Sequence, residues 1–243
     1  MSSSSKSDLR IDWASHEAAK FACENWHYSK CLPVGKLVKV GAWEDGKYIG
    51  CVIFGRGANH NMLKPFGLSQ DQGCELVRIA LKKHKTPVSR IMAIAIKFLK
   101  SKCPELRLIV SYADQDQNHH GGIYQATNWI YDGLVNVGAK TFIINGRQTH
   151  KKSVHSKGVK GSLADVKKYL DPRATEFFTK GKHRYLMPLD VKMRARIEPL
   201  AQPYPKREKQ ANVGTTDTAT VQHRSSRSNS LENKANLETK EVS

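Results

Sequence analysis

Titratable side chains gather directly after one apolar run, residues 106–112. The length and β-branched content of this run are typical of a buried strand. In open α/β sheets, ligands bind just beyond the carboxyl ends of strands, so we expect a site here. A solvated loop is the alternative interpretation, because loops are polar in any case. The group comprises Asp114, Asp116, His119 and His120, after which Gly121-Gly122 begins a short helix that carries Tyr124.

A second set of polar side chains lies where another predicted helix ends. Residues 16–28 carry apolar side chains at helical spacing, and Ser15 is a favourable N-terminal cap. His27 and Tyr28 come at the C-terminal end of this helix. Side chains at a helix end can point into a cleft, so both are candidate site residues. The alternative for His27 is a cation that interacts favourably with the helix dipole.

Clear turn and helix-start signals predict the elements that position these residues. Asp45-Gly46 and Asn145-Gly146 each lie between apolar runs, which predicts two β-hairpins. Thr86 followed by Pro87 predicts the start of a helix. We predict strands at 36–43, 48–54, 74–81, 106–112, 141–144 and 147–149, and helices at 16–28, 87–102 and 162–170.

The N-terminus of the helix at 87–102 is a candidate anion site. Ser89 and Arg90 lie in its first turn, and a basic loop precedes it. Free backbone N–H groups and the helix dipole favour a phosphate at such a position. An ordinary surface loop is the alternative, and the pattern alone does not choose between the two.

The charge of the chain predicts a polyanionic partner. The formal net charge is +18, and residues 208–243 contribute none of it, because they hold five basic and five acidic side chains. Nucleic acid is favoured over a membrane surface, since no basic amphipathic helix with bulky apolar anchors is present. Aromatic side chains interleave with the cations of residues 150–207, which suits phosphates and unstacked bases. The candidate DNA contacts are Lys151, Lys152, Lys157, Lys160, Lys182 and Arg184.

Cysteine spacing and hydropathy predict an intracellular protein. The five cysteines are scattered without a C-x-x-C pair, which argues against a disulfide framework and a zinc ribbon. We find no signal peptide and no apolar run long enough to cross a bilayer. We predict a flexible leader at 1–11, a catalytic core at 12–150, a basic extension contributing to DNA binding at 151–207, and a disordered tail at 208–243.

The order of predicted elements resembles the GNAT acyltransferase fold, a mixed, mostly antiparallel α/β sheet flanked by helices. The resemblance implies an acyl-CoA-type donor between the strands at 74–81 and 106–112, with Arg78, Ser89 and Arg90 as cofactor contacts. Residues 123–129 are similar to the family pattern L-Y-x-x-x-G-F, which implies that Tyr124 acts as general acid. The Gly-rich pyrophosphate loop of that family, Q/R-x-x-G-x-G/A, is missing from residues 80–90.

Longer strings resemble the Mom DNA-modification proteins of Mu-like phages over about residues 9–207. The resemblance implies an enzyme that converts adenine in double-stranded DNA to N6-(carbamoylmethyl)adenine. Such an enzyme would protect phage DNA from restriction in the host cytoplasm, with iron(II) as a candidate cofactor. The strings are FACENWHYSKCLPVGKLVKVGAWEDGKYIGCVIFGRGA, CELVRIAL, PVSRIMAIAIKFL, LIVSYAD, GGIYQATNWIY and KHRYLMPLD.

The expected chemistry gives each candidate residue a role. Reaching an amine inside a duplex requires flipping the base into a pocket, and the weakly nucleophilic amine requires a base and an activated electrophile. We assign Asp114 as base or metal ligand and Tyr124 as proton donor, with His27 and Tyr28 closing the site. His27, Tyr28 and Asp114 are also the candidate iron(II) ligands. His119-His120 beside Asp116 is a rival metal set, ranked second because neighbouring residues rarely ligate one ion together.

Two other functions remain open at this stage. One is a non-catalytic DNA-binding phage protein on a GNAT-like scaffold, and the other is an acyltransferase acting on protein amines. The identity of the group donor and the oligomeric state, with a homodimer as one option, are not determined by the sequence. Convergence of Asp114, Tyr124 and His27 in space would favour an enzyme over a binding protein.

Overall fold

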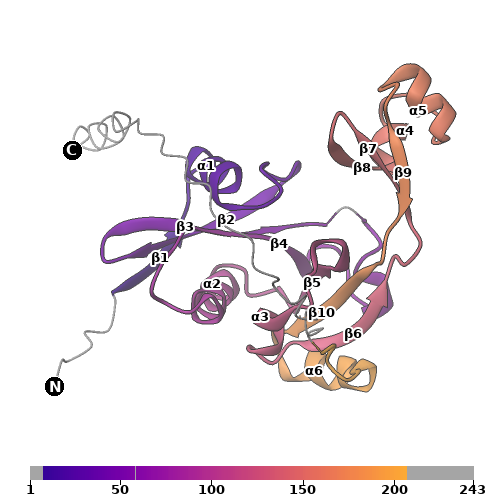
Figure 1. Cartoon of the computed structure of the whole chain (residues 1–243). Helices are drawn as coiled ribbons and strands as arrows, with labels where there is room; N and C mark the ends of the chain where they lie inside the picture. Colours follow the sequence, from indigo (N-terminus) through magenta and orange to yellow (C-terminus); the bar gives the residue numbers. More distant parts are fainter. Residues whose placement is uncertain (1–7, 58, 207–243) are drawn as a thin grey trace, which may run out of the picture. The chain divides into compact units, whose positions relative to one another are not determined.

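A seven-stranded sheet forms the centre of the protein, whose computed structural model describes residues 8–57 and 59–206 (Figure 1). Its strands are β1 (Leu9–Trp13), β2 (Leu37–Glu44), β3 (Lys47–Gly55), β4 (Gly73–Leu81), β5 (Leu108–Asp114), β6 (Ile130–Val135) and β10 (Lys182–Pro188). The strand order is β1-β2-β3-β4-β5-β10-β6. Only β4 and β5 pair in parallel, and every other neighbouring pair in this sheet is antiparallel.

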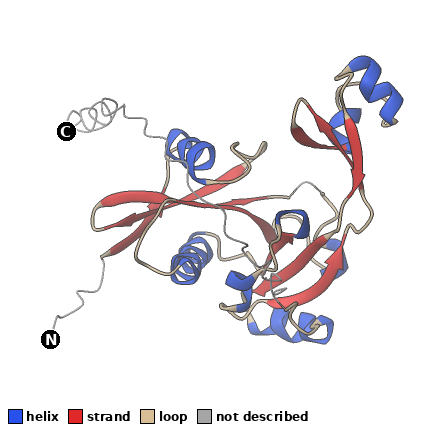
Figure 2. Cartoon of the chain, viewed as in Figure 1, coloured by secondary structure: helices blue, strands red, loops and turns tan. Residues whose placement is uncertain are grey.

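Two helices cover opposite faces of this sheet, α1 (His16–Trp26) and α2 (Val88–Lys102) (Figure 2). Successive side chains of a strand point to opposite faces. Along β3, Val52 accordingly belongs to the core beneath α2, and Ile53 belongs to the core beneath α1. The hydroxyl of Ser15 accepts a backbone N–H of the first turn of α1, which confirms the predicted cap.

Both predicted hairpin turns are present. Asp45 and Gly46 have φ angles of 50° and 75°, and Asn145 and Gly146 have φ angles of 50° and 72°. Two consecutive residues with positive φ match the twist of antiparallel strands, which is why Asp-Gly and Asn-Gly occur there. The second hairpin joins β7 (Lys140–Ile144) to β8 (Arg147–His150), and with β9 (Thr175–Phe178) these strands form a separate three-stranded sheet.

The predicted flexible leader at 1–11 is wrong for its last residues. Leu9 to Trp13 form β1, which pairs along β2 at the edge of the sheet. Leu9 and Ile11 pack against the core beneath α2, so the strand is held by apolar burial as well as by its ladder. The polar composition of residues 1–8 masked this short strand. Residues 1–7 lie outside the described residues, as does the predicted tail at 208–243.

The predicted boundary at residue 150 is also wrong. β10 lies between β5 and β6, and its Tyr185 and Leu186 are fully buried. The central sheet therefore needs residues far beyond 150, and the segment 151–207 is not a peripheral extension. Pattern recognition missed this because β10 begins with KHR, whose charges resemble those of a surface segment.

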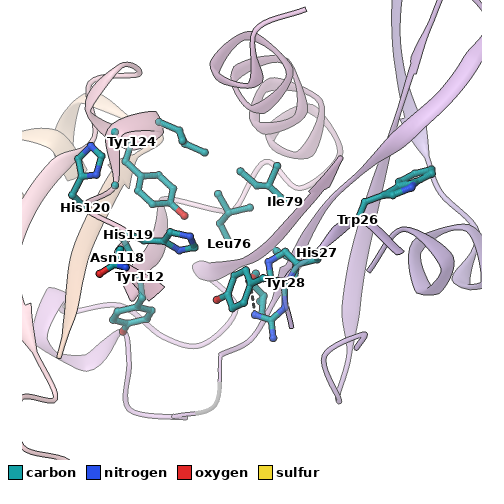
Figure 3. Close-up of a pocket in the computed structure, with 16 residues that line it drawn as sticks. Trp26, His27, Tyr28, Leu76, Ile79, Tyr112, Asn118, His119, His120 and Tyr124 are labelled. Atoms are coloured by element: carbon teal, nitrogen blue, oxygen red, sulfur yellow. Dashed lines mark hydrogen bonds between the residues drawn. The ribbon is translucent and has the colours of Figure 1, made fainter. Parts of the chain in front are cut away.

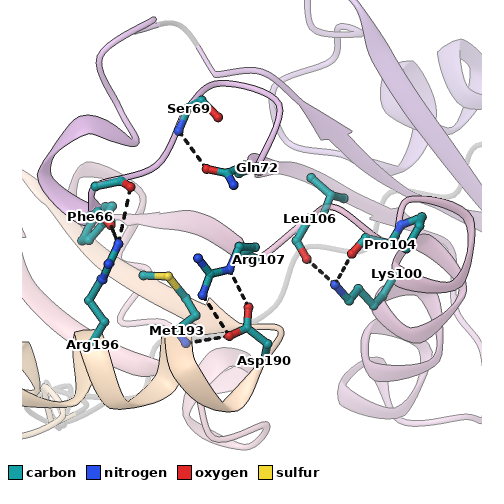
Figure 4. Close-up of polar contacts among 11 residues, drawn as sticks. Phe66, Ser69, Gln72, Lys100, Pro104, Leu106, Arg107, Asp190, Met193 and Arg196 are labelled. Atoms are coloured by element: carbon teal, nitrogen blue, oxygen red, sulfur yellow. Dashed lines mark hydrogen bonds and ion pairs between the residues drawn. The ribbon is translucent and has the colours of Figure 1, made fainter.

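A C-terminal helix, α6 (Val191–Ile197), covers a second apolar cluster that includes Leu108 and Leu186. Asp190 fixes the start of this helix (Figure 4). Its carboxylate accepts the backbone N–H of Met193 at 2.7 Å and two hydrogen bonds from the Arg107 guanidinium, at 2.8 and 3.1 Å. These bonds hold the pKa of Asp190 at about 2, so the contact persists at neutral pH.

The parallel strands β4 and β5 separate halfway along their length. Their pairing runs from Gly73↔Leu108 to Leu76↔Ser111 and ends there, although both strands continue. The register of β3 with β4 shifts at the same point, between Ile53 and Phe54. Such an opening between the fourth and fifth strands is what the GNAT resemblance implies, and the predicted GNAT-like α/β fold is confirmed. No helix within residues 8–57 and 59–206 is long and apolar enough to span a bilayer.

Candidate active site

A pocket of about 510 Å³ opens where β4 and β5 separate (Figure 3). Three segments line it: the end of α1, the second half of β4, and the segment that leads from β5 into α3 (Gly122–Gln125). This volume is within the range of small-molecule sites. The lining side chains that can do chemistry are His27, Tyr28, Arg78, Tyr112, Asn118, His119, His120 and Tyr124. Three of the four predicted catalytic residues therefore converge.

Tyr124 reaches the pocket from α3 and is tied to β5 by a hydroxyl chain. Its phenol oxygen lies 2.8 Å from Ser111 Oγ, which lies 2.9 Å from the carbonyl oxygen of Leu76. The carbonyl can only accept, so Ser111 donates to it and the Tyr124 O–H donates to Ser111. Burial raises the pKa of Tyr124 to about 12, and the phenol is protonated at neutral pH. The phenol therefore carries its proton inside the pocket, as the predicted role of proton donor requires.

His27 is held as a neutral imidazole. Its Nδ1 accepts the backbone N–H of Ser29 at 3.1 Å, so in the neutral ring the proton sits on Nε2. Burial, with help from nearby Arg78, lowers the pKa of His27 to about 4. The predicted helix-dipole cation is therefore excluded at neutral pH. His27 can offer a hydrogen bond from Nε2, but that nitrogen cannot act as a base or a metal ligand in this tautomer.

We expect the stability of the fold to fall as pH is lowered from about 6.5 to about 4, in part through His27. In this window the unfolded chain binds more protons than the folded chain, because the folded pKa is the lower one. Urea unfolding at neutral pH and at a pH inside the window should show a larger loss in the wild type than in His27→Gln. Equal losses in the two proteins would contradict the assignment.

Asp114 lies at the end of β5 as predicted, but it does not line the pocket. Its carboxylate accepts the backbone N–H of Asp116 at 3.0 Å and lies 3.2 Å from Lys182 Nζ on β10. Only 13% of the Asp114 side chain and 28% of the Lys182 side chain are exposed. The geometry favours an organising role for Asp114 over the predicted role of base, because its oxygens are already engaged.

Replacing Asp114 should therefore destabilise the protein. We expect Asp114→Ala to lose about 1–3 kcal/mol, since a half-buried ammonium group and a backbone N–H lose their acceptor. Urea unfolding of Asp114→Ala, Lys182→Met and the double variant measures the coupling. The double variant should lose less than the sum of the single variants. Strict additivity would show that the ion pair does not stabilise the fold.

The loop that precedes α2 already binds a carboxylate of the protein itself. The Glu44 carboxylate accepts the backbone N–H groups of Lys85 and Thr86 at 2.8 and 2.7 Å, and the Thr86 hydroxyl at 2.6 Å. These bonds lower the pKa of Glu44 to about 2. A second anion on the backbone of residues 85 and 86 would meet this carboxylate, so Glu44 disfavours a pyrophosphate at that point of the loop. Ser89 and Arg90 do not line the pocket.

Of the predicted cofactor contacts, Arg78 alone lies in the pocket. Its Nη1 donates to the carbonyl of Val77 at 2.9 Å, while its buried Nε has no hydrogen-bond partner among the described residues. A buried guanidinium N–H without an acceptor is a position where an anionic or carbonyl oxygen of a ligand would be stabilised.

The predicted iron(II) ligands do not form a site suited to that ion. Within the described part of the chain, no group of three or more His, Cys, Asp or Glu side chains could hold a metal. Asp114 is bonded to Lys182, and His27 presents a proton at Nε2. In the rival set, Asp116 accepts the backbone N–H of Lys180. Iron(II) stays a prediction.

The predicted DNA contacts divide into two groups. Lys182 and Arg184 belong to β10, where Lys182 pairs with Asp114 and Arg184 lies 2.6 Å from Asp132. Their charges are paired within the fold, which disfavours the predicted contacts of these two side chains with DNA. The other four are exposed and lie on or just after α4 (Lys151–His155), namely Lys151, Lys152, Lys157 and Lys160.

Sequence reasoning missed Ser111 and Glu44. Ser111 has a local signal, because it is the one serine inside the apolar run LIVSYAD and its burial demands a partner. Glu44 has none, since its partners Lys85 and Thr86 lie about forty residues further along the chain.

The separated parallel strands, with a partly buried phenol in the pocket between them, are those of a group-transfer enzyme of GNAT-like fold. The chain belongs to the Mom protein family, whose model matches residues 8–206. The methylcarbamoylase Mom of Escherichia phage Mu is 22% identical over 206 residues, which cover 82% of this chain and 84% of that protein. A solved structure from Acinetobacter baylyi ADP1, described as a "Putative Acetyltransferase", is 13% identical with a TM-score of 0.43. That match covers 83% of this chain and 99% of the other.

Proposed function

We propose that this protein transfers a carbamoylmethyl group to N6 of adenine in double-stranded DNA. The single observation that carries the proposal is the convergence of Tyr124, His27 and Arg78 on one pocket in a chain of the Mom family. A binding protein has no use for a partly buried proton donor and a neutral imidazole that line the same pocket. The net charge of +18 favours a polyanionic substrate over a protein amine.

The substrate base must leave the duplex to reach this pocket. Its volume of about 510 Å³ has room for one flipped base and a small transferred group. Tyr28 and Tyr112 line it and offer rings on which a base can stack. Tyr28 is half-exposed and lies at the end of α1, whereas Tyr124 lies deeper, so we place the entering base on the Tyr28 side.

In the proposed reaction, N6 forms a bond to the methylene carbon of the donor as the bond between that carbon and the leaving group breaks. The Tyr124 hydroxyl turns from Ser111 and gives its proton to the leaving group. The tyrosinate then accepts the proton that N6 loses, which restores the phenol. The His27 Nε2–H and the Arg78 guanidinium stabilise oxygens of the donor. The Glu44 carboxylate on the loop before α2 disfavours an acyl-CoA held there by its pyrophosphate, so we place the donor in the pocket itself.

Mass spectrometry of nucleosides from DNA co-expressed with the protein tests this function. We expect N6-(carbamoylmethyl)deoxyadenosine with the wild type and unmodified deoxyadenosine with Tyr124→Phe. Folding of both proteins is checked by thermal unfolding. Only unmodified deoxyadenosine in the presence of folded wild-type protein would overturn the proposal, and a modified protein amine instead would favour the acyltransferase alternative.

A further inference from the structure

A small module is inserted at the tip of a hairpin of the main sheet. β6 and β10 are antiparallel neighbours, and Val135 lies opposite Lys182 where the hairpin would normally turn. Residues 136–181 fill this turn with β7, β8, β9, α4 and α5 (Leu163–Tyr169), which lie together in Figure 1. The module has its own apolar core, which includes Phe142, Val154 and Val166. The main sheet does not need these residues to pair β6 with β10.

The module is strongly basic, and its few acids are engaged internally. Residues 140–180 contain ten Lys and Arg side chains and three Asp and Glu side chains. Asp165 bonds Ser162 at the start of α5, and Asp171 accepts the backbone N–H groups of Asn145 and Arg173. Glu176 pairs with Lys140 at 3.0 Å. These carboxylates stabilise turns and strands of the module itself, so most of the positive charge remains available to a partner.

Exposed rings accompany these cations. Tyr169 and Phe178 are 61% and 64% exposed, and a lysine ammonium lies 5.0 and 5.9 Å from the respective ring centroids. Large aromatic side chains beside lysines are typical of surfaces that contact both the phosphates and the sugars or bases of nucleic acid. An acidic protein would be attracted by the charge but would have less use for the rings.

The neck of the module is bonded to the loop that lines the pocket. The backbone N–H of Lys180 donates to Asp116 at 3.1 Å, and the N–H of Gln115 donates to the carbonyl of Gly181 at 3.2 Å. The Asp114–Lys182 ion pair adds a third contact between these two segments, at the end of the sheet. The loop then runs on to Asn118 and beyond, which line the pocket. A duplex bound on the module would thus be held at the pocket's edge.

We propose that the inserted module is the arm that grips the phosphate backbone of double-stranded DNA. The inference rests on the proposed function for its substrate, and it adds where the duplex is held. Its grip is electrostatic, so it does not depend on base sequence. The pocket then receives the flipped base. The hydrogen bonds between Lys180 and Asp116 and between Gln115 and Gly181 hold the pocket loop at a fixed position relative to the bound duplex.

The test measures binding of a fluorescent DNA duplex across a range of salt concentrations. The arm variant carries Lys151, Lys152, Lys157 and Lys160 as Gln, and the control variant carries Lys47, Lys64, Lys97 and Lys192 as Gln. Both variants remove the same charge from exposed positions. We expect the log–log salt slope of the arm variant to fall by about 0.9 for each phosphate that the protein no longer neutralises, while the control keeps the wild-type slope. Equal slopes for arm and control variants would overturn the proposal.

Two further measurements separate this proposal from its alternatives. Joining Val135 to Lys182 through an Asn-Gly turn removes the module, and thermal unfolding checks that the sheet persists. This shortened protein should lose duplex binding at least as severely as the arm variant. Competition by polyglutamate as strong as that by DNA would overturn the proposal in favour of an acidic protein partner. Weakened DNA binding by the arm variant, together with no modified nucleoside in wild-type samples, would support the arm and reject the proposed reaction. Unchanged DNA binding by the arm variant, together with modified nucleoside in wild-type samples, would reject the arm alone.

Discussion

Tyr124→Phe should lower transfer by about 10²–10⁴-fold while leaving the fold intact, which is the usual contribution of a positioned proton donor. The ring keeps its packing against Trp129 and Tyr185, with centroids at 4.9 and 5.0 Å. The variant loses only the phenol O–H, and Ser111 keeps its bond to the Leu76 carbonyl. Modified deoxyadenosine quantified by mass spectrometry gives the activity, and urea unfolding gives the stability.

Tyr48→Phe is the matched control for Tyr124→Phe. Its half-buried hydroxyl donates to the carbonyl of Ala18 at 3.2 Å, beneath α1 and away from the pocket lining. We expect it to lose a little stability and no activity. Wild-type activity in Tyr124→Phe would remove the phenol from the mechanism, and the proton would then have to come from solvent.

Gly121→Ala should be the most damaging small substitution in the site. Gly121 has φ of 80°, and an added Cβ would lie 2.3 Å from the Tyr185 ring, which is fully buried. The left-handed backbone costs about 1–2 kcal/mol for an L side chain, and overpacking costs about 1–3 kcal/mol more. Because Tyr185 also donates to the carbonyl of His120, displacing it moves the pocket wall. We expect loss of activity together with a clear drop in urea midpoint.

Gly122→Ala offers the comparison one residue away. Its Cβ would meet only the far end of the His120 ring, at 3.0 Å, and its φ lies outside the left-handed region. The imidazole can move, so we expect near-normal stability and a smaller loss of activity. If both alanine variants unfold at the same denaturant concentration, the close approach of Gly121 to Tyr185 does not control the site.

Local signals predicted the elements, and long-range pairing limited what else could be predicted. The Asp45-Gly46 and Asn145-Gly146 turns, the Ser15 cap and the long helix from Pro87 follow from neighbouring residues, and all were confirmed. β10 could not be placed, because its neighbours β5 and β6 are separated from it by the inserted module. A strand that starts with Lys-His-Arg looks exposed until its acidic partners are known.

The residues of the site also divide into those that local signals predict and those that depend on long-range contacts. Tyr124 and His27 could be predicted because strand ends and helix ends gather functional groups, and both line the pocket. Asp114 satisfied the same rule but is engaged by Lys182, a partner that only the sheet order reveals. The Gly-poor loop after β4 suggested that the usual donor site was altered. The Glu44 carboxylate that occupies part of this loop could not be predicted, because it reaches Lys85 and Thr86 from the end of β2.

The position of β10 has a consequence for synthesis on the ribosome. β5 and β6 emerge long before β10, and they must wait with unpaired edges until residues 182–188 arrive. Non-local pairing of this kind slows folding, and open strand edges in the nascent chain invite aggregation. Tyr185, which lies against Gly121 and donates a hydrogen bond to the carbonyl of His120, belongs to β10. A chain halted before residue 188 therefore has no finished pocket, which can form only after β10 has left the ribosome.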